Sequence, residues 1–155
     1  MVARAHFNRG ISQEAKGRLR QAMQDYTDAI KLNPQYSPPY NNRALLYSRQ
    51  GKKKLALRDF DRSIEVDPTN FYALNSRGRF YPVDRADPKR AIEDFERAIA
   101  ANSGFAVSYA NRGFANEKLG NKQAAIADLE KALVLGATEQ QRPVILRSLK
   151  KLKKQ

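Results

Sequence analysis

The sequence predicts an all-α protein in which four helical hairpins stack into a solenoid, followed by one C-terminal helix. Two observations predict this fold. Small and turn residues recur at a constant spacing, since Gly10 and Ala44, like Gly17 and Gly51, lie 34 residues apart. Between these positions, apolar residues return at the three- and four-residue spacing that is typical of one face of a helix. A period of this length predicts a repeated helical unit without a β-sheet.

Residues 37–70 show the unit most clearly. Ser37 is expected to cap the first helix, with Pro38 at the first position, where a residue without an amide hydrogen is tolerated. Gly51 is expected to end this helix, and Asp67 with Pro68 to stop the second helix. The apolar positions are Tyr40, Ala44, Leu45 and Tyr47 in the first helix and Leu55, Ala56, Phe60 and Ile64 in the second.

The same hairpin is predicted at residues 3–36, 71–105 and 106–137, so that repeats occupy residues 3–137. The third copy has one extra residue in its turn. Pro82 is expected to cut its first helix short, and Asp87 and Pro88 to begin the second helix as its cap and first residue. We interpret this insertion as a tolerated loop, with a specialised contact loop as the alternative.

The small residues mark places where the two helices of a hairpin must approach closely, because bulk there would push the helices apart. On the first helices these residues are Gly10, Ala44, Gly78 and Gly113. Large residues of the second helices are expected to fill the core beside them, as buried aromatic and aliphatic side chains usually do. These core residues are Tyr26, Phe60, Phe95 and Leu129.

A pair of opposite charges also recurs in every copy. An Arg precedes the small residue of the first helix, and an Asp lies 16, 16, 17 and 16 residues further on, in the second helix. Residues equally far from a hairpin turn lie at the same height, so each Arg is predicted to bind the Asp of its own hairpin. The alternative is a ladder of arginines that binds anions. The pairs are Arg9 with Asp25, Arg43 with Asp59, Arg77 with Asp94, and Arg112 with Asp128.

Residues 138–155 are predicted to form a basic capping helix. Thr138 and Gln141 resemble a capping box at its start. An apolar stripe is expected to cover the last hairpin while the lysines remain in solvent. The stripe consists of Val144, Ile145, Leu149 and Leu152.

The composition bounds the possible functions. The 155 residues carry a formal net charge of +13, and such a surface can attract nucleic acid, acidic proteins or anionic lipid. With no Cys, one His and no phosphate-binding loop, we expect no enzyme, no cofactor and no metal site. No segment reaches the roughly 20 apolar residues that span a bilayer. We expect a soluble chain, with the cytoplasm favoured; oligomeric state is not readable, and a repeat that begins at Ala3 is compatible with a piece of a longer protein.

The period and the register of the small residues resemble the tetratricopeptide repeat family over residues 3–137. This resemblance implies a right-handed α-solenoid and a non-enzymatic protein-protein interaction scaffold. In this family, the first helices form a concave groove that receives a peptide or a helix of a partner protein. The groove positions that carry over to this chain are Asn8, Ile11, Asn41, Asn42, Leu45, Asn75, Ser76, Arg79, Asn111 and Phe114.

The groove implied in this way is rich in Asn, whose amide donates and accepts hydrogen bonds and therefore suits the main chain of an extended ligand. We expect the amides of Asn42, Asn75 and Asn111 to be available to a ligand; the alternative is that they only hold the helices together. The Lys, Asn and Arg set with which some family members clamp chaperone tails is missing, since Phe7 and Ile11 occupy two of its places.

The alternative function is binding of RNA or another acidic surface through the basic C-terminal helix. Against it, no aromatic residue stands among the terminal lysines to stack on bases.

Overall fold

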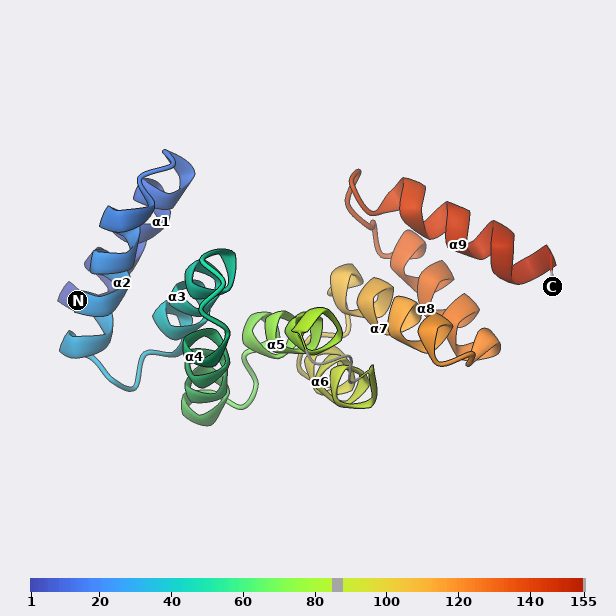
Figure 1. Ribbon diagram of the computed structural model, residues 1–155, viewed down its shortest axis with the longest axis horizontal. Helices are drawn as coiled ribbons and strands as arrows, with labels where there is room; N and C mark the ends of the chain where they lie inside the picture. The colour runs from blue at the N-terminus through green and yellow to red at the C-terminus, as the bar shows by residue number, and fades with distance from the viewer. Residues whose placement is uncertain (85–87, 155) are drawn as a thin grey trace. The chain divides into compact units, whose positions relative to one another are not determined.

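The structure, a computed structural model, describes residues 1–84 and 88–154 (Figure 1). This part of the chain contains nine α-helices and no strand, which confirms the predicted all-α fold. Two compact units make up the chain, Met1–Ser76 and Arg77–Gln155. Among the described residues, no helix is both long and apolar enough to cross a membrane.

The first unit contains two complete hairpins and the start of a third. The first hairpin consists of α1 (Val2–Ala15) and α2 (Leu19–Leu32), the second of α3 (Ser37–Arg49) and α4 (Lys53–Val66), and α5 (Phe71–Asp84) begins in this unit. The two helices of each complete hairpin pack together, and α2 also packs against α3. Gly17 and Gly51 have φ angles of 73° and 71°, a left-handed conformation that allows the chain to turn tightly between the paired helices.

The second unit contains the remainder of α5, then α6 (Pro88–Ala101), α7 (Ala106–Lys118), α8 (Lys122–Val134) and α9 (Arg142–Lys154). The helices α6 and α7, α7 and α8, and α8 and α9 pack against one another. The last three helices share a core of buried residues. Its members are Ala110, Ala125, Leu129, Ala132, Ala137, Ile145, Leu149 and Leu152.

The predicted C-terminal helix is present, and three of its four stripe residues are buried against α8. The prediction is wrong for Val144, which is 50% exposed. One step along a helix turns by about 100°, so Val144 faces away from the side that carries Ile145. At the start of α9, the amide of Gln141 donates to Thr138 Oγ1 at 3.3 Å, which is half of the predicted capping box.

Within the hairpins, the paired helices touch at the small residue of the first helix. A Cβ atom built on Gly10 would lie 2.6 Å from Tyr26 Cε1, and one built on Gly78 would lie 2.7 Å from Phe95 Cε1. Both rings are almost completely buried, so neither can move aside without opening a cavity. The predicted close approach is therefore confirmed, and the second-helix aromatic residue is the group that it accommodates.

Ser37 does not cap α3 as predicted. It is the first residue of this helix, it is buried, and its hydroxyl donates to the carbonyl oxygen of Ser63 at 2.8 Å. The Ser63 hydroxyl donates in return to the Ser37 carbonyl oxygen at 3.1 Å, which joins α4 to α3. Asn70 completes the cluster, because its Nδ2 donates to Ser37 Oγ at 2.7 Å while its Oδ1 accepts the Ala73 amide at the start of α5.

The insertion in the third hairpin differs from its prediction in one respect. The helix α5 continues past Pro82 to Asp84, so Pro82 does not cut it short. A proline removes one amide donor, and the helix here extends only two residues beyond it, so few further backbone hydrogen bonds depend on its geometry. The next helix begins at Pro88 as predicted, whereas the predicted cap Asp87 lies outside the described residues.

The close approach of the helices can be tested with single methyl groups. We expect Gly78→Ala to lower the free energy of unfolding by about 1 to 2 kcal/mol, because overpacking against Phe95 outweighs the better helix propensity of Ala. The matched variant Gly113→Ala should cost less, since its Cβ would meet Leu129 Cγ at 2.9 Å, and a Leu side chain has more staggered rotamers to relieve the contact than the Phe95 ring. Urea unfolding followed by circular dichroism measures both. An increase in stability for Gly78→Ala would contradict this account.

Candidate functional site

The recurring arginines bind the aspartates of their own hairpins, as predicted. Arg43 Nε donates to Asp59 Oδ2 at 2.6 Å and its second nitrogen, Nη2, donates to Oδ1 at 3.1 Å. The same two-point geometry is present in the other three copies. Its donor-to-acceptor distances, from Nε to Oδ2 and from Nη2 to Oδ1, are 3.1 and 2.6 Å for Arg9 with Asp25, 2.7 and 2.7 Å for Arg77 with Asp94, and 2.8 and 2.7 Å for Arg112 with Asp128. A ladder of anion-binding arginines is therefore excluded, because these guanidinium groups are already paired.

The pairs differ in how deeply the arginine is buried. The Arg43 side chain is 11% exposed, whereas that of Arg9 is 60% exposed. The hydrogen bond from Arg9 nevertheless lowers the pKa of Asp25, against the opposing effect of burial. In the last hairpin, the hydrogen bond to Asp128 raises the pKa of Arg112.

In the first unit, the predicted groove residues surround one cavity of about 470 Å³. Of the residues predicted for this unit, Asn8 is exposed and does not line this cavity. Sequence reasoning missed the part of the wall that comes from the ends of helices, including Tyr72, whose side chain is 57% exposed. The lining residues are Phe7, Ile11, Pro38, Asn41, Asn42, Leu45, Asn70, Tyr72, Asn75 and Ser76.

The amides in this cavity are less available than the sequence suggested. Asn42 Nδ2 donates to the Tyr26 hydroxyl at 3.3 Å, and Asn42 Oδ1 accepts from Asn41 Nδ2 at 3.2 Å. Asn75 is only 5% exposed. One N–H of the Asn42 amide is thus used by a residue of the preceding hairpin, while its second N–H is left over on a partly buried side chain, so its use by a ligand stays a prediction.

The side-chain carbonyl of Asn41 differs from the hydrogen-bonded amide of Asn42. Asn41 is 6% exposed, and its Oδ1 has no hydrogen-bond partner among the residues that the structure describes. A buried acceptor without a partner costs free energy, roughly 1 to 3 kcal/mol. Asn41 lines the cavity, but its Oδ1 is itself buried, so a donor in the cavity would reach this oxygen only after the Asn41 side chain turns toward it.

Behind the cavity, a polar chain holds Asn42 in place. The Tyr26 hydroxyl donates to Glu14 Oε2 at 2.8 Å, and Glu14 also accepts from Arg49 Nη1 at 2.8 Å. Burial, the larger cause, raises the pKa of Tyr26 to about 12, so the phenol remains a donor at neutral pH. Helices α1, α2 and α3 are thus linked at the point where the cavity wall is formed.

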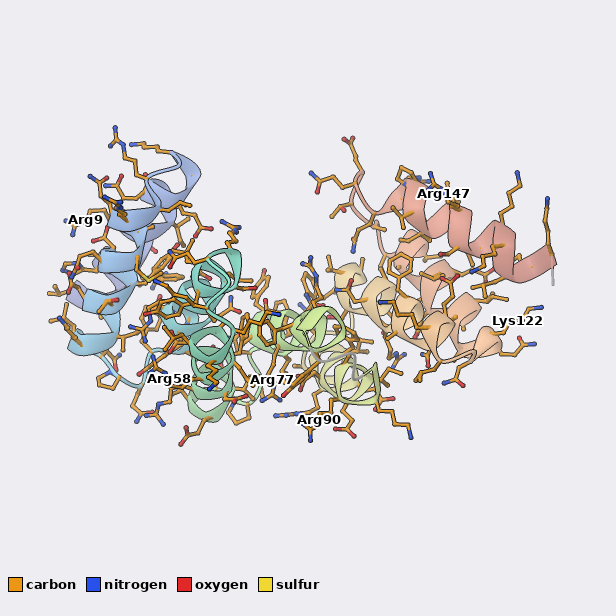
Figure 2. The ribbon with its side chains drawn as sticks, in the orientation of Figure 1. Arg9, Arg58, Arg77, Arg90, Lys122 and Arg147 are labelled. Atoms are coloured by element: carbon orange, nitrogen blue, oxygen red, sulfur yellow. The ribbon has the colours of Figure 1, made fainter. Side chains whose placement is uncertain are left out.

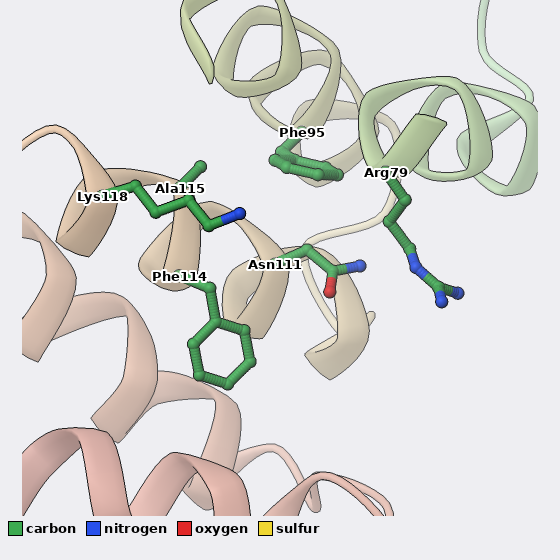
Figure 3. Close-up of a pocket in the computed structure, with 6 residues that line it drawn as sticks. All are labelled: Arg79, Phe95, Asn111, Phe114, Ala115 and Lys118. Carbon is green, nitrogen blue, oxygen red and sulfur yellow. The ribbon is translucent and has the colours of Figure 1, made fainter. Parts of the chain in front are cut away.

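In the second unit, the remaining predicted residues, Arg79, Asn111 and Phe114, line two adjoining cavities. The smaller, of about 140 Å³, lies between Arg79 of α5, Phe95 of α6 and Lys118 of α7 (Figure 3). Figure 3 shows Lys118 reaching along α7 toward Asn111, whose amide points to the side of Arg79. The larger cavity, of about 370 Å³, is closed by residues around the start of α9, namely Thr138, Gln140, Gln141 and Val144.

Charged side chains cover the surfaces of both units (Figure 2). Two lysines of α9 hold this helix in place: Lys153 Nζ lies 2.6 Å from Glu130 Oε1, and Lys151 Nζ lies 3.3 Å from Glu117 Oε1. Ser148 Oγ donates to the other oxygen of Glu117 at 2.8 Å. Among the described residues, no cluster of three or more His, Asp or Glu side chains is placed to bind a metal ion.

Comparison with known proteins identifies the repeats. The profile of the tetratricopeptide repeat matches residues 3–36, 38–70 and 106–135, which together make up more than half of the chain. The chain belongs to the tetratricopeptide repeat family. A curated relative, human tetratricopeptide repeat protein 6, is 50% identical over 40 residues. That match covers 26% of this chain and 8% of the length of the relative, so the tetratricopeptide repeat is what the two share.

Solved structures have the same fold at low sequence identity. The pilF structure of Pseudomonas aeruginosa superposes with a TM-score of 0.86 at 18% identity and covers 97% of this chain and 67% of its own. A chain of the APC/C heterotetramer Cut9–Hcn1 has a TM-score of 0.82 at 24% identity over 94% of this chain and 29% of its own. A thermophilic tetratricopeptide repeat protein of Thermus thermophilus has a TM-score of 0.76 at 23% identity over 97% of this chain and 80% of its own. These likenesses establish a helical-repeat solenoid fold.

The ion pairs should stabilise the hairpins in proportion to their burial. We expect Arg43→Met to lower the free energy of unfolding by about 3 kcal/mol, because it leaves the buried Asp59 carboxylate without its bidentate partner. The matched variant Arg9→Met should cost less although Asp25 is as buried as Asp59, because solvent screens the ion pair of the exposed Arg9 and His6 Nδ1 still lies 3.5 Å from Asp25 Oδ1. Urea unfolding of both variants measures the two losses in unfolding free energy. Equal losses would show that the burial of the arginine does not determine how much the ion pair stabilises its hairpin.

The lowered pKa of Asp25 gives a pH dependence of known sign. An unfolded Asp titrates near about 3.9, and the folded value lies below this, so the folded chain binds the proton more weakly. The stabilisation is therefore complete above about pH 5 and is lost as the pH falls through the folded pKa. We expect the difference in unfolding free energy between the wild type and Asp25→Asn to shrink as the pH falls below about 4. If this difference in unfolding free energy instead grows as the pH falls, the pKa of Asp25 is not lowered by folding and the prediction is wrong.

Proposed function

We propose that this tetratricopeptide repeat chain is a non-enzymatic scaffold that binds an extended peptide or a helix of a partner protein along its first helices. In this proposal the repeats comprise residues 3–36, 37–70, 71–105 and 106–137, and residues 138–155 act as the cap. The family supports a role in protein interaction. The groove assignment is supported by the grouping of Ile11, Asn41, Asn42, Leu45, Asn75 and Ser76 around one cavity.

The observation that carries the proposal is the unpartnered Oδ1 of Asn41 beside this cavity. An extended peptide supplies amide hydrogens along its main chain, and one of them would satisfy this acceptor once the buried Asn41 side chain turns toward the cavity. The surrounding Phe7, Ile11, Leu45 and Tyr72 offer an apolar contact for a neighbouring side chain. The peptide would thus gain a hydrogen bond and apolar burial in one place.

Binding through the basic C-terminal helix is the weaker alternative. Lys151 and Lys153 of α9 already bind Glu117 and Glu130, so part of the charge of this helix is used within the chain. The remaining positive charge supports attraction to acidic surfaces in general rather than a defined site.

The test uses peptides selected by phage display against the full chain and measured by fluorescence anisotropy. Peptides whose binding is weakened by Tyr72→Ala are taken to bind at this cavity. For these peptides, Asn41→Ala should raise Kd about 2- to 10-fold, because it removes one hydrogen bond with a net value of about 0.5 to 1.5 kcal/mol. The matched control Asn8→Ala should leave Kd unchanged, because Asn8 is exposed and lines no described cavity.

Thermal melting by circular dichroism accompanies each variant, so that loss of binding is separated from loss of fold. Selected peptides that bind the wild type, Tyr72→Ala and Asn41→Ala equally well would rule out this cavity. Equal weakening by Asn8→Ala and Asn41→Ala, with both variants folded, would contradict the role given to the Asn41 carbonyl.

A further inference from the structure

The adjoining cavities of the second unit differ in chemistry from the cavity of the first. Two cations, Arg79 and Lys118, line them, while the first unit's cavity has no charged residue in its wall. Both cations are exposed, and neither forms a hydrogen bond or an ion pair with any residue that the structure describes. They contrast with the four repeat arginines and with Lys151 and Lys153, all of which are paired.

No acidic side chain contributes to the described walls of these two cavities. The carboxylate adjacent in sequence to Lys118 is that of Glu117, and it is directed to α9, where Ser148 and Lys151 bind its two oxygens. Its side chain is only 18% exposed. The positive charge of Lys118 is therefore not neutralised by its neighbour, because the docking of α9 has used that carboxylate.

The apolar part of the wall lies between the cations. Phe95 and Phe114 line the smaller cavity, whose volume of about 140 Å³ is close to the roughly 150 Å³ that holds a benzene-sized group. Phe114 also belongs to the larger cavity, together with Arg79 and Asn111. An apolar side chain can thus enter between two positive charges that lie on different helices, α5 and α7 (Figure 3).

We propose that the groove formed by Arg79, Asn111, Phe114 and Lys118 binds an acidic protein segment, in which a large apolar side chain is flanked by carboxylates. This inference rests on the proposed function and names the class of partner. The apolar side chain would occupy the smaller cavity beside Phe114, and the carboxylates would bind Arg79 and Lys118. The apolar wall favours a peptide over a nucleic acid, which would present phosphates to the cations and needs exposed rings for its bases.

The experiment repeats the phage-display selection on the full chain and compares the wild type with the double variant Arg79→Gln/Lys118→Gln. We expect the wild type to enrich peptides that combine Asp or Glu with Phe, Leu or Trp, and the double variant to bind them at least about ten-fold more weakly. The control Arg147→Gln/Lys131→Gln removes the same charge at exposed positions of α9 and α8 and should retain nearly full affinity.

Three outcomes would overturn the inference, and they separate it from the proposed function. If the enriched peptides lack acidic residues, and if Phe114→Ala but not Arg79→Gln/Lys118→Gln weakens their binding, the proposed scaffold function stands and the acidic partner is rejected. Peptides insensitive to both Phe114→Ala and Tyr72→Ala would reject groove binding itself. Tight binding of a fluorescent oligothymidylate that is lost in Arg79→Gln/Lys118→Gln, without any peptide binding, would assign the groove to nucleic acid.

Discussion

The close contact between the two helices of a hairpin is the constraint on which the rest of the structure depends. Where Gly10 and Gly78 stand, the backbone of the first helix rests directly on the rings of Tyr26 and Phe95. This contact brings the helices near enough for an Arg on one to reach an Asp on the other with two hydrogen bonds. The ion pair then completes the hairpin, because the aspartate is almost fully buried and needs a partner. The packing of the two helices and the Arg–Asp ion pair thus both depend on the short distance between the helices.

Polar side chains connect one hairpin to the next and thereby limit what is left for a ligand. The Tyr26 hydroxyl links Glu14 to Asn42, and Ser37, Ser63 and Asn70 join the ends of three helices in the first unit. Each group used in this way is lost to binding, because a satisfied amide or hydroxyl gains little from exchanging partners. The candidate sites therefore consist of the groups that the connections leave over: the Asn41 carbonyl in the first unit, and Arg79 and Lys118 in the second.

In the C-terminal helix, too, the side chains that hold the fold together affect what is left for a ligand. Ile145, Leu149 and Leu152 complete the core that α7 and α8 begin, and Lys151 and Lys153 fix the helix through carboxylates of those two helices. By binding Glu117, α9 removes the negative charge beside Lys118 from the groove. A helix that covers the end of the core thus also sets the charge of the adjoining cavity.

The sequence by itself determined the all-α repeat, the buried residues and the four Arg–Asp pairs, because each of these follows from local spacing along one helix or across one short turn. It also indicated most of the residues that line the cavities, through the family pattern. It misplaced Ser37, and it could not show that the Tyr26 hydroxyl binds the Asn42 amide or that Glu117 is directed away from Lys118. Only the tertiary structure decided these points. Whether a polar group has a hydrogen-bond partner depends on the residues that the next hairpin, or α9, places beside it. The spacing of residues within one helix does not predict those contacts.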